Sequence, residues 1–108
     1  MTIKETKNIL DDCLIYRNKI DSLKLEVDST TSEFLKSKIK DEINELTQKV
    51  MDIRCKIDSL DGKHVKLVMR YRYVNGLSFK DIAEKLGVSY QWINKVYNKG
   101  LEQMSKML

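Results

Sequence analysis

The chain contains no proline and only four glycines among its 108 residues, so few positions break or bend a helix. Charged residues make up 33% of the chain and apolar residues 42%. No apolar run approaches the roughly 18 residues that a membrane-spanning helix needs, and the N-terminus lacks the basic-then-apolar shape of a signal peptide. We therefore expect an almost entirely helical, cytoplasmic protein with no membrane partner.

Side chains suited to catalysis or metal binding are also scarce. Cys13, Cys55 and His64 are the only residues of their types, and they form neither a CxxC pair nor a zinc-finger spacing. No GxSxG, GKS or HExxH motif is present. The sequence thus predicts reduced cysteines, no metal, no cofactor and no enzymatic activity.

The first half of the chain shows the spacing of a coiled-coil seam, in which apolar residues alternate by fours and threes. Between two such runs lies a polar cluster over residues 28–32, where Thr30 and Glu33 have the spacing of a capping box. We predict two helices, over residues 3–28 and 31–60, that fold back near Thr30 as an antiparallel coiled-coil hairpin. The two runs are Ile9, Cys13, Tyr16, Ile20, Leu23 and Val27, and then Ile39, Ile43, Leu46, Val50, Ile53, Ile57 and Leu60.

This hairpin, assigned to residues 1–61, leads to two further expectations. Cys13 would face the neighbourhood of Thr47, so Cys13 and Cys55 would not meet in a disulfide. Several apolar side chains lie outside the seam, and they must widen it, cover the rest of the chain or contact a second copy: Ile3, Leu10, Leu14, Ile15, Leu25, Phe34 and Leu35. Exposed apolar patches usually mark interfaces, so the sequence favours a homo-oligomer, with a dimer preferred.

Residues 62–108 form the second predicted domain. Gly62 is expected to end the preceding helix in a left-handed conformation, and a helix follows from His64 to Val74. Residues 61–108 hold nine Lys and Arg against four Asp and Glu, a net charge of +5, whereas residues 1–60 hold 11 against 12, a net charge of −1. A basic C-terminal half is the electrostatic pattern of a phosphate-binding module.

The run LSFKDIAEKLGVSYQWINKV, from Leu77 to Val96, has the layout of a helix-turn-helix. Ser78 caps a first helix, with Asp81 three residues later. Ala83 lies where two helices would cross, Gly87 provides the turn, and Ser89 caps a second helix. The second helix is expected to turn these residues inward: Ile93, Val96, Leu101, Met104 and Leu108.

The opposite face of that second helix has the chemistry of a surface that reads DNA bases. It contains no acidic residue from Ser89 to Gly100. Asn and Gln side chains pair bidentately with adenine, and Lys donates to guanine or phosphate. By helical phase the outward residues are Tyr90, Gln91, Asn94, Lys95 and Asn98, with Trp92 at the flank. Ser89 leaves the first-turn N–H groups free to face a phosphate.

The segment from Val65 to Leu108 resembles the C-terminal, promoter-reading region of bacterial sigma factors, through RYVNGLS (Arg72–Ser78), IAEKLGVS (Ile82–Ser89) and KGLEQM (Lys99–Met104). This resemblance implies base contacts by Tyr90, Gln91, Asn94 and Lys95. It implies phosphate contacts by these residues: Ser78, Lys80, Ser89 and Lys99. Sigma factors typically have Arg and Glu where this chain has Tyr90, Gln91 and Trp92, so a different DNA sequence is expected.

In size and architecture the chain is similar to small phage transcriptional regulators of the ArpU and RinA kind. Together these patterns predict an all-α protein that reads double-stranded DNA with the helix over residues 89–100, as a sequence-specific regulator encoded by a phage or prophage. One alternative is a DNA-packaging subunit of the small-terminase type. Another is a sigma-like adaptor that binds RNA polymerase without reading DNA.

Overall fold

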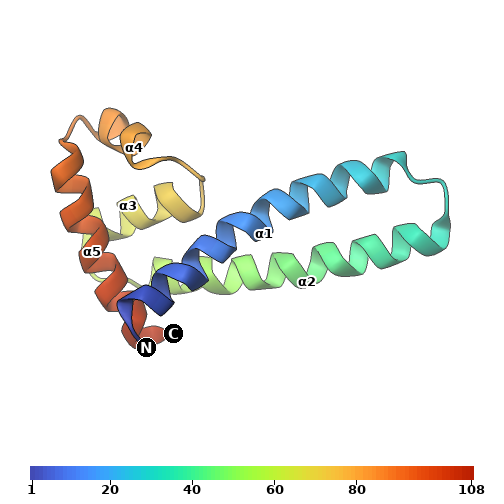
Figure 1. The fold of residues 1–108 in the computed structure, drawn as a ribbon, viewed down its shortest axis with the longest axis horizontal. Coiled ribbons are helices and arrows are strands. Elements are labelled where there is room, and N and C mark those ends of the chain that lie inside the picture. Colours follow the sequence, from blue (N-terminus) through green and yellow to red (C-terminus); the bar gives the residue numbers. More distant parts are fainter.

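The computed structural model describes residues 1–108 and consists of five α-helices and no strands. They are α1 (Ile3–Ser29), α2 (Glu33–Asp58), α3 (Lys63–Tyr73), α4 (Phe79–Leu86) and α5 (Tyr90–Met107). Figure 1 shows α1 and α2 as a long hairpin that projects from the group formed by α3, α4 and α5. The predicted all-helical architecture, with an N-terminal antiparallel hairpin, is confirmed. None of the helices combines the length and apolar character that a membrane span requires.

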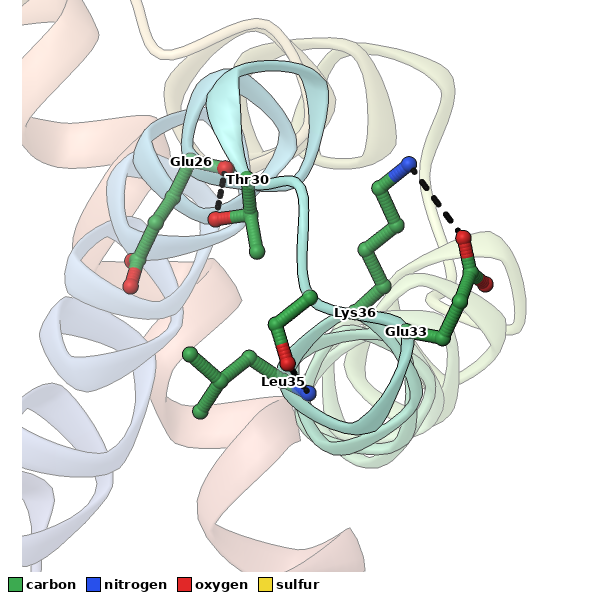
Figure 2. Close-up of polar contacts among 6 residues, drawn as sticks. Glu26, Thr30, Glu33, Leu35 and Lys36 are labelled. Carbon is green, nitrogen blue, oxygen red and sulfur yellow. Dashed lines mark hydrogen bonds and ion pairs between the residues drawn. The ribbon is translucent and has the colours of Figure 1, made fainter.

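The turn between α1 and α2 differs from the predicted capping box (Figure 2). The Thr30 hydroxyl donates to the carbonyl oxygen of Glu26 at 2.8 Å, so it satisfies the end of α1 instead of the start of α2. Ser32 caps α2 by accepting from the backbone N–H of Leu35, and Glu33 pairs with Lys36. The capping-box prediction was wrong because α1 continues to Ser29, which leaves Thr30 within reach of the last turn of α1.

The second helix also ends earlier than predicted. Its last residue is Asp58, and Ser59 forms the cap. Gly62 has a positive φ of 96°, as expected of this glycine, but it precedes α3 and does not cap α2. The backbone N–H of Asp61 donates to the Gln103 side chain at 2.7 Å, and that side chain donates back to the Asp61 carbonyl at 2.9 Å. This reciprocal pair ties the loop to α5.

The distal part of the hairpin is held together by a small apolar cluster of Ile20, Leu23, Ile39 and Leu46. These residues belong to the two predicted seams. Cys13 lines a hollow together with Val50 and Ile53, which follow Thr47 along α2 by about one and two helical turns. Cys13 is buried, Cys55 is exposed, and both are free thiols.

The main core lies where the hairpin meets the three C-terminal helices. It joins residues of α1 and α2 to residues of α3, α4 and α5 in one cluster, and Leu10, Cys13 and Ile57 are its buried members at the junction. Leu14 packs against the same cluster. Leu10 and Leu14 therefore cover the C-terminal helices, which was one of the roles considered for apolar residues outside the seam.

The other apolar residues outside the seam are exposed. Their exposed fractions are 43% for Ile3, 61% for Ile15, 73% for Leu25, 67% for Phe34 and 50% for Leu35. Three of them, Leu25, Phe34 and Leu35, lie towards the end of the hairpin that points away from α3, α4 and α5. This chain alone therefore does not bury them.

Candidate nucleic-acid interface

The segment from Leu77 to Val96 folds as the predicted helix-turn-helix. The Ser78 hydroxyl accepts from the backbone N–H of Asp81, and the Ser89 hydroxyl accepts from that of Trp92, both at 3.1 Å. Gly87 ends α4 with φ 67° and ψ 36°, a left-handed conformation that is strained for a residue with a Cβ. Ser78 and Gly87 thus mark the two ends of α4, and Ser89 marks the start of α5.

The contact between α4 and α5 is apolar and closely packed. Ile82 and Ile93 are fully buried, and Ala83 is 9% exposed, all within the main core. The inward-facing residues predicted on α5 are confirmed, because Val96, Leu101 and Met104 are buried as well and Leu108 packs against the core. The crossing therefore fixes which face of α5 remains free.

A close approach of α3 also orients α5. A Cβ placed on Gly100 would lie 2.7 Å from Met69 Sδ and 2.8 Å from Met69 Cγ, and Met69 is fully buried. Only a residue without a side chain lets the methionine lie directly on the α5 backbone at this distance. This explains on physical grounds why the sequence has glycine in the middle of its longest C-terminal helix.

The free face of α5 exposes the residues that the sequence assigned to DNA. Gln91, Asn94, Lys95, Asn98 and Lys99 are all exposed, and Tyr90 is 51% exposed. Trp92 is half-buried at the flank, Ser78 and Lys80 are exposed at the start of α4, and Ser89 is exposed in the turn. The structure thus brings the ten predicted residues together on α4, the turn and α5. Their contacts with DNA remain predictions.

Two edge-to-face aromatic pairs attach the flanks of α5 to its neighbours. Tyr90 lies against Phe79 at the start of α4, with ring centroids 6.2 Å apart and planes at 80°. Trp92 lies against His64 at the start of α3, with centroids 5.4 Å apart and planes at 78°. The exposed face of α5 is therefore bordered by the first turn of α4 on one side and the first turn of α3 on the other.

A buried polar contact connects α1 of the hairpin to α3 and α5. The hydroxyls of Tyr73 and Tyr97 are 2.5 Å apart, and Tyr73 also donates to Asp11 at 3.3 Å. Burial raises the pKa of both phenols, so they stay protonated at neutral pH. Either hydroxyl can donate in the contact between the two tyrosines, whereas the Asp11 carboxylate only accepts.

The loop before α4 is held by Arg72. Its guanidinium donates to the Leu77 carbonyl at 3.0 Å and lies 5.2 Å from the Phe79 ring centroid. The start of α4, which holds Ser78 and Lys80, is thereby fixed against α3. No role was predicted for Phe79, Tyr73 or Tyr97, because helical spacing does not show which distant residue an aromatic side chain contacts.

Two helices joined by a left-handed turn, a small buried residue at their crossing and an exposed Gln- and Asn-rich face on the second helix define a helix-turn-helix protein. Residues 57–106 match the family model of sigma-70, region 4. The C-terminal part of this chain is accordingly a sigma-like helix-turn-helix region, as its sequence resemblance implied. No curated protein and no solved structure gives a match to the chain.

The family match supports a DNA-binding regulatory role, and sigma-70 region 4 is a non-enzymatic family. The match begins at Ile57, in the last turn of α2, so it includes one of the residues through which the hairpin contributes to the main core. The hairpin before that point lies outside the match.

Proposed function

We propose that this protein is a sequence-specific transcription regulator that reads the major groove of double-stranded DNA with the first half of α5. The observation that carries the proposal is the free face of α5, where Gln91, Asn94, Lys95 and Asn98 are exposed within a helix-turn-helix that matches sigma-70 region 4. Amide side chains pair bidentately with adenine, and lysine donates to guanine or phosphate, so these residues favour base readout.

The charge distribution supports the same partner. The residues from 61 to 108 have a net charge of +5, and α5 has no acidic residue before Glu102. Lys95 and Lys99 extend this basic surface along the exposed side of α5. An excess of cations attracts the phosphate backbone before any base is read, and this part of the affinity falls as salt rises.

We further propose that two copies associate through the hairpin. The support is the set of exposed apolar side chains on α1 and α2, among which Leu25 and Phe34 are the most exposed. The shape of a long hairpin attached to a sigma-like unit supports a phage or prophage regulator that acts in the cytoplasm of its host.

The test is the selection of bound sites from random double-stranded DNA, with light scattering on the same sample. A regulator of this kind enriches one sequence motif and scatters as a dimer. A closed ring of eight or more chains would indicate the packaging alternative. Failure to retain DNA at low salt, together with binding to RNA polymerase, would indicate the adaptor alternative.

A further inference from the structure

A small cavity lies where the hairpin meets the C-terminal helices. Its volume is about 160 Å³, and the residues that line it come from α1, α2 and the end of α3. Seven of the nine lining residues are hydrophobic, and none of the ten residues assigned to DNA is among them. The proposed reading of DNA therefore leaves this cavity without a role.

The inner wall of the cavity is apolar. Cys13, Ile57 and Tyr73 all line it, and all three are buried. Burial raises the pKa of the Cys13 thiol, which therefore stays neutral at neutral pH. In another protein an apolar cavity of about 150 Å³ binds benzene, so a body of about the size of a six-membered ring fits a space of this volume.

Two arginines border the side of the cavity that reaches solvent. Arg54 is exposed and Arg17 is half-buried. Neither of them has an ion pair or a side-chain hydrogen bond, whereas Arg70 and Arg72 do. No acidic residue lines the cavity. Two guanidinium groups without anionic partners thus lie at the edge of an apolar space.

The Arg17 guanidinium has a defined place at this edge. A Cβ placed on Gly76 would lie 2.8 Å from Arg17 Nη1, so the guanidinium lies directly against this glycine of the loop between α3 and α4. Its charge also acts on the inner wall, because it partly offsets the rise that burial causes in the pKa of Cys13. Arg17 is therefore close to both the loop and the apolar interior of the cavity.

We propose that this cavity binds a small carboxylic acid, with the apolar body inside it and the carboxylate paired with Arg17 and Arg54. A planar guanidinium matches a carboxylate through two parallel hydrogen bonds. Inorganic phosphate has no apolar body to cover the hydrophobic walls, so the lining favours an organic acid. A bound acid would touch α1, α2 and the end of α3 at once. The proposal goes beyond the reading of DNA and does not depend on it.

The first experiment uses benzoate as the probe, with the full chain and at constant ionic strength. Benzamide has the same ring without the charge, and acetate has the charge without the ring. Isothermal titration calorimetry should show that benzoate binds about tenfold tighter than either control, because the ion pair and the buried ring each contribute about a factor of ten. Benzoate should also raise the melting midpoint as its concentration rises.

Single substitutions then test the two arginines. Arg17→Met should weaken benzoate about tenfold and leave benzamide unchanged, because methionine keeps an apolar side chain and removes the charge. Arg54→Met should act in the same direction but less strongly, because Arg54 is exposed to water. The matched control is Lys24→Met. Lys24 lies two turns after Arg17 on the same side of α1, and it lines the neighbouring hollow but not this cavity, so benzoate binding should not change.

Methionine methyl groups locate the bound ring. Met51 lines the cavity and Met107 does not, although they are similarly exposed, at 43% and 37%. In proton–carbon NMR spectra of protein labelled at the methionine methyl groups, the ring current of benzoate should shift the Met51 signal and leave the Met107 signal in place. Met51→Leu assigns the signal.

Four results would each overturn the proposal. Benzoate does not bind, or benzamide binds as tightly as benzoate. Lys24→Met weakens benzoate as much as Arg17→Met does, or benzoate shifts the signal of Met107 and not that of Met51. All of these measurements are made without DNA, so failure here is distinct from failure of the proposed function, which the selection of bound sites tests.

Discussion

Removal of one hydroxyl from the Tyr73–Tyr97 pair should destabilise the protein by an amount that depends on which hydroxyl is removed. Tyr73 is 1% exposed and Tyr97 is 4% exposed, so neither hydroxyl has ready access to water. Tyr97→Phe leaves Tyr73 with Asp11 as its acceptor. Tyr73→Phe leaves the Tyr97 hydroxyl without its only side-chain partner. Neither change empties much volume, so the comparison isolates hydrogen bonding.

The two expected costs differ because an unsatisfied buried polar group costs more than a lost hydrogen bond. Tyr97→Phe should lower the free energy of unfolding by about 0.5–1.5 kcal/mol, the net value of one hydrogen bond. Tyr73→Phe should lower it by about 1–3 kcal/mol, because the Tyr97 hydroxyl remains buried and unpaired. The double variant should cost less than the sum of the two, since no hydroxyl is then left without a partner.

Urea denaturation at neutral pH followed by circular dichroism measures these differences, with thermal melting as a second readout. For a chain of this size each kcal/mol corresponds to about 4 °C in the melting midpoint. The slope of unfolding free energy with urea should be the same in all variants, because the surface exposed on unfolding does not change. If Tyr97→Phe costs as much as Tyr73→Phe, Asp11 is not the acceptor that keeps the Tyr73 hydroxyl satisfied.

Three other changes test the packing and the assembly. Ala83→Leu should cost about 1–3 kcal/mol by overpacking the α4–α5 crossing and should abolish DNA binding; unchanged melting and binding would mean that Ala83 is not at this contact. Gly100→Ala gains about 1 kcal/mol of helix propensity, but the clash with Met69 should outweigh it; a more stable variant in thermal melting would refute that close approach. Leu25→Lys combined with Phe34→Lys should convert a dimer to a monomer that keeps its helical circular dichroism, since both side chains are largely exposed in the single chain; a dimer that persists in light scattering would exclude this part of the hairpin.

The helix-turn-helix was predictable from the sequence because each of its signals acts locally. Ser78 and Ser89 each cap the helix that begins at the next residue. The left-handed conformation at Gly87 favours a residue without a Cβ. The buried and exposed faces of α5 follow from helical phase alone. A pattern of this kind requires no knowledge of what the helix packs against.

The rest of the structure depends on contacts between distant residues and was not predictable in the same way. Thr30 and Ser32 both have hydroxyls suited to capping α2, and which one acts depends on where α1 ends. The flanking of α5 by α3 depends on the contact of His64 with Trp92, 28 positions apart in the sequence, which no spacing rule identifies.

The central claim is that the exposed face of α5 reads bases, and a salt titration of Gln91→Ala and Asn94→Ala on a selected and a scrambled duplex tests it most directly. Each substitution should cost about 1–3 kcal/mol on the selected duplex and relax the preference at particular base pairs. Lys99→Ala should weaken binding to both duplexes alike and lower the salt slope by about one. If Gln91→Ala and Asn94→Ala leave the ratio of the two affinities unchanged, this face of α5 does not read bases.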